Sequence, residues 1–333
     1  AAVAELAGPS LVATATDGPL AGGPQGDFLY GTEADDTLSG EGGNDYLDGV
    51  AGNNQLVGGS GDDLLVARPG RHHYDGGPDT DTLLVAADTA LALSDTTLGP
   101  APAGPAPRPE LAAELEIGPS QIGPSQFAPS TLNNLEKAIL VGGDGDNWLD
   151  AGAFGGAVQA DGGPGDDWLV GGAGPNRLRG GPGSDGLVGG DSDDVLQGSN
   201  ELQRRGIDGL WGGGGRDRFV LAQGGEHHYL DKSLDNGAGP SANTQGQANY
   251  AIIADLDPTQ DSIQLIDTAA AYRLVPGQPP ELAPQRLAGR TAVSLYWVGE
   301  TGQAPDLLAV LLGPPDLLEL TLQSQVFVYD ASG

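Results

Sequence analysis

GGSGDDLLV occupies residues 58–66, and its pattern of glycines, an acidic pair and an apolar tail decides the fold. The same pattern returns as GEGGNDYLD at 40–48, GGPGDDWLV at 162–170, GGPGSDGLV at 180–188 and GGGGRDRFV at 212–220. Set out in nines, the register runs through seven repeats in one block and, with two insertions, through eight in a second. All fifteen eighth positions are bulky and apolar, and thirteen of the fifteen sixth positions carry Asp or Asn. A disordered chain has no reason to hold this register, so the sequence predicts a repeat structure.

Each nonapeptide predicts a tight turn followed by a short strand. Glycines at the first, second and fourth positions allow backbone conformations that a Cβ disfavours. The last three residues form a strand whose middle side chain, at the eighth position, points inward. Two nonapeptides complete one coil, so repeats n and n+2 stack around a thin leucine core that no single coil could build. We therefore expect an all-β fold, a parallel β-roll solenoid in two repeat blocks with a C-terminal antiparallel β cap that covers the open end.

Composition narrows the classes of function. The 333 residues carry 46 acidic against 14 basic side chains, a net charge of −32, which opposes binding to nucleic acids or anionic membranes and favours cations. The absence of Cys excludes disulfides and thiol chemistry, and the longest apolar run, LLAVLL at 307–312, is too short to span a bilayer. The start at Ala1 without Met indicates a processed chain or a fragment. Serine-hydrolase and zinc-protease motifs are absent, so we expect no enzyme activity from this chain.

The sixth positions predict metal sites. Stacking brings carboxylates two repeats apart close together, such as Asp45 with Asp27 and with Asp63, and a divalent cation between the turns removes their repulsion. Oxygen-only ligands favour Ca²⁺ over zinc or copper, and Mg²⁺ is a weaker candidate because it demands a stricter octahedron. We expect about eight to eleven Ca²⁺ ions. The candidate ligands are Asp27, Asp36, Asp45, Asn54, Asp63, Asp81, Asn147, Asp167, Asn176, Asp185, Asp194, Asp208 and Asp217.

Two sixth positions depart from the pattern. His72 and Gly156 replace the acid, so the pairs that they form with Asn54 and with Asn176 are the weakest candidate sites. Asn147 and Asn176 can bind a cation through the side-chain carbonyl oxygen, but they contribute no charge.

The pattern G-G-x-G-x-D-x-U-x resembles the calcium-binding nonapeptide of the repeats-in-toxin (RTX, haemolysin-type) family. LNNLEKAILVGGDGDNWLDAGAFGGAVQADGG at 132–163 is similar to the segment that starts a second roll in large exported, cell-surface members. DRFVLAQGGEHHYLD at 217–231 and YAIIADLDPTQDSIQLID at 250–267 resemble the domain that closes such rolls. The resemblance implies a β-roll with Ca²⁺ along both edges, type I secretion, and folding after export. Binding at sites absent from the unfolded chain contributes directly to folding, which agrees with calcium-triggered folding.

The chain divides by composition into five segments. The segment between the rolls contains the tandem pentads IGPSQIGPSQFAPST at 117–131, which predict a surface excursion, with a partner-binding or glycosylated loop as the alternative. Whether the two rolls are continuous stays open at this point. The predicted segments are an N-terminal extended segment (1–21), a first roll (22–85), connecting strands with a Pro-rich loop (86–141), a second roll (142–220) and a capping domain (221–333).

All four histidines lie in two copies of one tripeptide, at 72–74 and 227–229. We expect both copies to mark a coil that changes shape, with Tyr74 and Tyr229 pointing inward, and a transition-metal site is the alternative.

Several aromatic residues are candidates for ligand contact. Trp148 and Trp168 occupy seventh positions, which we expect to face outward. If the C-terminal segment is a carbohydrate-binding or adhesion module rather than a cap, Tyr272, Tyr296 and Trp297 are its candidate stacking residues.

These features together predict an extracellular calcium-binding β-roll protein that folds on Ca²⁺ into a rigid acidic rod with a structural or adhesive role at the cell surface. Self-assembly into a fibre or surface layer is a further hypothesis, because AAVAELAGPSLVATATDG at 1–18 could pair with the sheet edge of a neighbouring copy. Expected partners are calcium ions, and a second copy or a cell-surface polysaccharide. The alternative is an RTX secretion and folding module of an exported hydrolase or polysaccharide-modifying enzyme, and a third hypothesis is a cation buffer.

Overall fold

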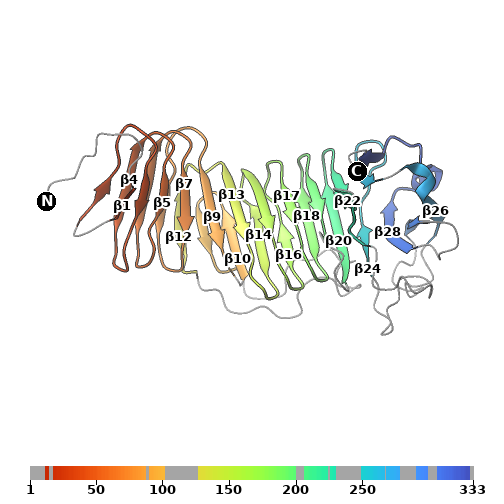
Figure 1. Cartoon of the computed structure of the whole chain (residues 1–333), viewed down its shortest axis with the longest axis horizontal. Coiled ribbons are helices and arrows are strands. Elements are labelled where there is room, and N and C mark those ends of the chain that lie inside the picture. Colours follow the sequence, from red (N-terminus) through yellow and green to blue (C-terminus); the bar gives the residue numbers. More distant parts are fainter. Residues whose placement is uncertain are drawn as a thin grey trace.

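The protein is an elongated roll of two long sheets, with a smaller C-terminal unit at one end (Figure 1). A computed structural model describes residues 12–14, 18–87, 90–101, 127–199, 206–223, 226–229, 249–266, 268–277, 290–298 and 306–330. The proline-rich stretch and most of the tandem pentads lie outside these residues. Within the described ranges, no helix has the length and hydropathy needed to cross a bilayer.

The first sheet has twelve strands, and all neighbouring strands in it are parallel. Leu47 pairs with Leu29 on one side and with Leu65 on the other, which is the n to n+2 register that the period of nine predicts. Its strands, in spatial order, are β1 (Val12–Thr14), β3 (Phe28–Tyr30), β5 (Tyr46–Asp48), β7 (Leu64–Ala67), β9 (Thr82–Ala86), β13 (Lys137–Val141), β15 (Ala157–Asp161), β17 (Arg177–Arg179), β19 (Val195–Gln197), β21 (Arg218–Val220), β25 (Ser262–Ile266) and β29 (Phe327–Asp330).

The second sheet has fifteen strands and includes the connecting segment and the end of the roll. A short antiparallel pair, β22 (Ala222–Gln223) and β23 (Glu226–His227), forms a separate two-stranded sheet that contacts β25. The fifteen strands, in spatial order, are β2 (Leu20–Ala21), β4 (Thr37–Gly42), β6 (Gln55–Ser60), β8 (His73–Asp75), β12 (Ser130–Asn133), β11 (Thr97–Gly99), β10 (Ala90–Ser94), β14 (Trp148–Ala153), β16 (Trp168–Val170), β18 (Gly186–Gly190), β20 (Gly206–Gly213), β24 (Asn249–Ile253), β28 (Asp306–Gly313), β27 (Thr291–Trp297) and β26 (Tyr272–Pro276).

The two repeat blocks form one continuous roll, which answers the question that the sequence left open. In the twelve-stranded sheet β13 pairs in parallel with β9 of the first block and with β15 of the second. In the fifteen-stranded sheet, β12 pairs in parallel with β8 of the first block, and β10 pairs in parallel with β14 of the second. Between them β11 runs antiparallel to both β10 and β12. The connecting segment therefore contributes strands to both sheets of the solenoid.

Eighth-position side chains from both sheets build the core, as the period predicts. Leu47, Leu65 and Leu187 are fully buried, and Tyr74 and Tyr229 lie in the same apolar cluster, which confirms that both tyrosines point inward.

The prediction that Trp148 and Trp168 face solvent is wrong. They expose only 3% and 0% of their surface and belong to a second apolar cluster with Trp211. Seventh positions do alternate away from the leucine core, but the opposite face of this part of the sheet is apolar as well.

The C-terminal end of the roll changes from parallel to antiparallel pairing. β28 continues the parallel stack from β24 and then pairs antiparallel with β27, which pairs antiparallel with β26. Two 3-10 turns connect this end to the twelve-stranded sheet, since η2 (Ala269–Ala271) lies between β25 and β26 and η3 (Pro315–Glu319) between β28 and β29. Tyr272 and Tyr296 are buried, with 4% and 8% exposure, so neither presents a free face for stacking on a sugar. At the other end β1 pairs in parallel with β3.

The tight turns depend on left-handed backbone at the second position of a repeat. Gly59 has a φ of +112°, which a glycine adopts without strain. Glu41 and Val50 occupy second positions with φ of +72° and +60°. A side chain disfavours this conformation, most of all when it is β-branched.

Candidate calcium sites along the two edges

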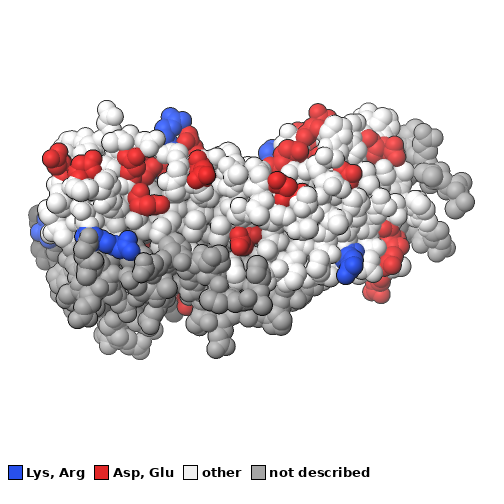
Figure 2. All heavy atoms as spheres, turned by 180° about the vertical axis from the view of Figure 1, so that it is seen from behind, with Lys and Arg blue, Asp and Glu red and all other residues white. Residues whose placement is uncertain are grey.

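The turns of the roll fall into two rows, one on each side of the coil. We call the turns that lead into the twelve-stranded sheet the first edge and those that lead into the fifteen-stranded sheet the second edge. Exposed acidic side chains gather mainly near the upper margin of the face seen in Figure 2, with few basic side chains among them. Sixth positions of the first edge are Asp27, Asp45, Asp63, Asp81, Gly156, Asn176, Asp194 and Asp217, and those of the second edge are Asp36, Asn54, His72, Asn147, Asp167, Asp185 and Asp208.

The sixth-position side chains form a hydrogen-bonded ladder along each edge. The backbone N–H of Asp27 donates to Oδ1 of Asp45 at 2.7 Å, Asp45 N–H to Oδ1 of Asp63 at 2.7 Å, and Asp63 N–H to Oδ1 of Asp81 at 2.8 Å. The second block repeats the arrangement, because the N–H of Asp167 donates to Oδ1 of Asp185 at 2.8 Å. One carboxylate oxygen of each residue therefore holds the preceding coil in place.

The second carboxylate oxygen accepts no hydrogen bond from any described residue at seven of these positions. These buried Oδ2 atoms belong to Asp45, Asp63, Asp81, Asp167, Asp185, Asp194 and Asp217. Leaving a buried carboxylate oxygen without a donor is costly, because nothing replaces the water that it loses on folding. A bound cation would meet this requirement.

Each such oxygen faces other oxygens rather than donors. A Cβ placed on Gly58 would collide with both Oδ2 of Asp63 and the carbonyl oxygen of Gly76. Gly40 has the same relation to Oδ2 of Asp45 and the carbonyl of Gly58. The first-position glycine is therefore required, since any side chain would fill the space where carboxylate and carbonyl oxygens converge.

The raised pKa values of these carboxyl groups reflect the electrostatic cost of burying their charged form. Burial raises the pKa of Asp45 and Asp217 to about 7, and that of Asp167 to about 8, although a backbone N–H donated to each carboxylate opposes the effect. Neighbouring carboxylates raise these pKa values further. Burial also raises the pKa of Asp63, Asp81 and Asp194, each to about 6. Carboxylates of this kind are stabilised in their charged form by a nearby cation.

The donor set fits Ca²⁺. Within the described ranges, no three His, Cys, Asp or Glu side chains gather as a metal-binding group, so a site here combines stacked carboxylates with carbonyl oxygens of the turns. Ca²⁺ accepts mixed carboxylate and carbonyl ligands in flexible geometry. When bound, it supplies the positive charge that these oxygens lack.

The other predicted ligands have protein partners. Oδ2 of Asp27 accepts the backbone N–H of Gly23 at 2.7 Å. Oδ2 of Asp36 accepts hydrogen bonds from the backbone N–H and the hydroxyl of Thr32, at 2.6 and 2.9 Å. Oδ2 of Asp208 accepts one from the Tyr229 hydroxyl at 2.7 Å. Oδ1 of Asn147 accepts one from Gly143 N–H at 2.7 Å.

The side chains of Asn54 and Asn176 are hydrogen-bonded in a different way from these residues. The side-chain amide of each donates to carbonyl oxygens of the turns. Among the predicted ligands, the bare oxygens are thus confined to a subset of the aspartates.

Two carboxylates in the ladder were missed by the sequence analysis. Glu136 Oε2 accepts the N–H of Asp81 at 2.9 Å, where the connecting segment joins the roll. Asp261 Oδ1 accepts the N–H of Asp217 at 3.0 Å and so continues the first edge beyond the repeats. Asp261 and Ile263 keep the spacing of the sixth and eighth positions, which was a usable signal without its glycines. Nothing in the sequence around Glu136 marks its role.

Comparison with known proteins agrees with this geometry. A family model for the RTX calcium-binding nonapeptide repeat matches residues 21–56, 48–83, 139–153 and 161–198. No curated protein matches the chain. Among solved structures, the extracellular lipase LipA from Serratia marcescens is similar, with 14% sequence identity and a TM-score of 0.20 over 94% of this chain and 40% of the lipase. The chain therefore spans less than half the length of that lipase.

The fold, the stacked carboxylates and the family match lead to one identification. The chain carries RTX calcium-binding nonapeptide repeats and folds as a calcium-binding β-roll.

Proposed function

We propose that the protein acts outside the cell as a structural or adhesive element, and that Ca²⁺ converts its chain from a disordered to a rod-like state. The observation that carries this proposal is the set of seven buried aspartate oxygens without a hydrogen-bond donor among the described residues. These oxygens make the metal-free roll unstable at neutral pH, so that calcium concentration controls folding. RTX repeats are typical of exported proteins, and calcium is plentiful outside the cell.

The continuous roll supports the mechanical part of the proposal. Both sheets run without interruption through the two blocks, so the calcium-bound chain forms one stiff body rather than two linked ones. Self-assembly into a fibre or layer remains part of this proposal. Its support is the short β1 strand, which leaves an edge of the twelve-stranded sheet at the N-terminal end.

The competing function is a secretion and folding module of a larger exported enzyme. In that case the roll would follow a catalytic domain in the full reading frame. Several hundred upstream residues with catalytic motifs would favour this alternative over a structural role. It shares the calcium-dependent folding but predicts no assembly of the isolated roll.

The test combines circular dichroism with sedimentation. We expect little β signal in EGTA, a β-rich compact monomer in millimolar Ca²⁺, and a poor response to Mg²⁺. Large particles that sediment only with Ca²⁺ would support assembly, whereas a monomer at high protein and Ca²⁺ concentrations would exclude it. Full β content and compactness after exhaustive EGTA dialysis would contradict calcium-dependent folding itself.

A further inference from the structure

Some turns of the roll place a nitrogen donor where the aspartate turns place a bare oxygen. In the aspartate turns Oδ2 lies against the first-position glycine and beside the carbonyl oxygen of the stacked coil. A Cβ on Gly171, at the first position, would lie 2.6 Å from Nδ2 of Asn176. Nδ2 of Asn54 has the same relation to Gly49. At these two turns an amide nitrogen therefore occupies the place where calcium would be needed. His72 differs, because its Nε2 lies near the fourth-position Gly70 and has no hydrogen-bond partner among the described residues.

Asn176 gives the most direct comparison. Its Nδ2 donates to the carbonyl oxygens of Gly172 and Gly189, at 3.0 and 3.2 Å, and Gly189 is the first residue of the stacked coil. In the aspartate turns, the equivalent carbonyl faces a carboxylate oxygen. Oδ1 of Asn176 accepts the N–H of Val158 at 3.1 Å, which fixes the orientation of the amide. The turn is hydrogen-bonded without a metal ion.

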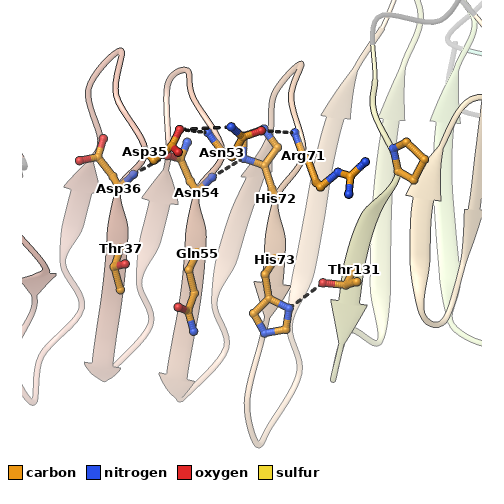
Figure 3. A pocket seen from close by; sticks show the side chains of 11 residues that line it. Asp35, Asp36, Thr37, Asn53, Asn54, Gln55, Arg71, His72, His73 and Thr131 are labelled. Carbon is orange, nitrogen blue, oxygen red and sulfur yellow. Dashed lines mark hydrogen bonds between the residues drawn. The ribbon is translucent and has the colours of Figure 1, made fainter.

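Asn54 repeats this solution on the second edge of the first block, next to His72 (Figure 3). Oδ1 of Asn54 accepts the N–H of Asp36 at 2.8 Å, and its Nδ2 donates to the carbonyls of Gly49 and Ala51 at 2.8 and 2.7 Å. Nδ1 of His72 accepts the N–H of Asn54 at 3.1 Å. Because Nδ1 is the acceptor, the ring proton of neutral His72 lies on Nε2, inside the turn.

The hydrogen-bonded ladder on this edge ends at an uncharged hydroxyl group. The N–H of His72 donates to Oγ of Ser130 at 2.9 Å, in strand β12 of the connecting segment. Asp36 at the other end of the row is already held by Thr32. This edge of the first block therefore has none of the bare aspartate oxygens, whereas the opposite edge has three, on Asp45, Asp63 and Asp81.

We propose that the turns at Asn54, His72 and Asn176 bind no calcium, because an amide N–H takes the place of the ion at Asn54 and Asn176, and a neutral imidazole replaces the carboxylate at His72. The inference rests on the calcium-dependent folding proposed above and refines it. Ions then load the first edge of the first block, and in the second block the second edge and the C-terminal part of the first. We call the turns at Asn54, His72 and Asn176 the metal-free waist. The turns at Asn54 and His72 lie on the edge opposite Asp45, Asp63 and Asp81, and the turn at Asn176 lies on the edge opposite Asp167 and Asp185.

This proposal removes two residues from the predicted calcium ligands. Asn54 and Asn176 were proposed as calcium ligands from the sequence because an amide oxygen can coordinate. In the structure that oxygen already accepts a backbone N–H, and the rest of the side chain is a donor. A donor N–H directed at the same carbonyl oxygens competes with a cation instead of binding it.

A gain-of-site variant tests the waist. Asn54→Asp replaces the amide donor by an oxygen beside the carbonyls of Gly49 and Ala51, and we expect one more Ca²⁺ bound per chain in equilibrium dialysis. In EGTA the same variant should lower folding stability. Asn53→Asp is the matched control, since it adds the same charge at an exposed neighbouring position and should leave the count unchanged. An unchanged count in Asn54→Asp would overturn the inference.

Loss variants and direct location complete the test. Asn176→Ala and His72→Gln should keep the wild-type count, whereas Asp167→Ala should lower it. A lower count in folded Asn176→Ala or His72→Gln would overturn the inference while leaving calcium binding intact. Wild-type chain that binds no Ca²⁺ would instead contradict the proposed function. If a variant fails to fold, anomalous scattering from wild-type crystals grown in Ca²⁺ decides the matter, since density at any of the three turns would refute the waist.

Discussion

Replacing Asp63 by Asn should have opposite effects on the metal-free and the calcium-bound roll. Asp63 lies between Asp45 and Asp81 in the ladder, where its Oδ1 accepts the N–H of Asp45 and its own N–H donates to Asp81. The variant keeps Oδ1 as the acceptor for Asp45 N–H but replaces the bare Oδ2 by an amide. As at Asn54, that amide can donate to the surrounding turn carbonyls.

The size of both effects follows from the structure. Burial raises the pKa of Asp63 to about 6, from the ordinary Asp value of 3.8. One pKa unit corresponds to about 1.4 kcal/mol, so the charged side chain costs the metal-free roll up to about 3 kcal/mol, and about 1 to 2 kcal/mol once solvent screening at the turn is included. Asp63→Asn removes this cost. It also removes a charge from the proposed calcium ligands, and we expect the Ca²⁺ midpoint of folding to rise about tenfold or more.

The assay is a Ca²⁺ titration of far-ultraviolet circular dichroism at pH 7.5, with a parallel folding titration in EGTA driven by trimethylamine N-oxide. Asp62→Asn is the control, because it removes the same charge from the adjacent exposed position and keeps the acceptor for Thr80 N–H. Equal shifts of the Ca²⁺ midpoint in the two variants would mean that bulk charge, and not ligation, is responsible. A destabilised Asp63→Asn chain in EGTA would refute the electrostatic argument.

Three further predictions concern the whole roll. The folded-state pKa values of Asp45 and Asp167 lie above the unfolded value, so the metal-free roll should be most stable below about pH 4 and lose that stability as pH rises through 7 to 8, seen as β signal in EGTA at pH 4.5 but not at pH 8. Val50→Gly should raise the Tm in saturating Ca²⁺ and stabilise the fold by about 1 kcal/mol, because it relieves a positive φ, and Val50→Ala should gain much less. Tyr229→Phe should destabilise the calcium-bound roll by about 1 to 3 kcal/mol in denaturant unfolding, because Oδ2 of Asp208 loses its donor, whereas the same change at Tyr74 should cost less.

Most of the fold could be predicted from the nine-residue period alone. The period fixes which residue enters the core and which coil lies next to which, and the pairing of Leu47 with Leu29 and Leu65 follows directly. The continuity of the two blocks could not be predicted, because strands β10 to β12 contain no glycine pattern and join the sheet by pairing over long sequence distances. Periodicity identifies local units, and long-range pairing of irregular strands lies beyond it.

The sequence predicts where the candidate sites lie, but not which of their side-chain oxygens lack a hydrogen-bond donor. The sequence locates the sixth residue of each turn, yet it does not tell whether the second side-chain oxygen is bare or bonded. Asp36 and Asp45 occupy the same position in neighbouring repeats. Oδ2 of Asp36 accepts the N–H and the hydroxyl of Thr32, whereas Oδ2 of Asp45 has no donor among the described residues. The outward expectation for Trp168 failed for a similar reason, because alternation along a strand says which face a residue occupies but not what covers that face.

The ladder of backbone bonds gives the roll a direction. Along the first edge, the backbone N–H of each sixth-position Asp or Asn donates to a carboxylate from later in the chain, and the last of these acceptors is Asp261, beyond the final repeat. Removing coils from the N-terminal end leaves each remaining N–H with its acceptor, whereas each coil removed from the C-terminal end strips the acceptor from a new last coil. We therefore expect folding of the roll to start at its C-terminal end and to spread toward the N-terminus.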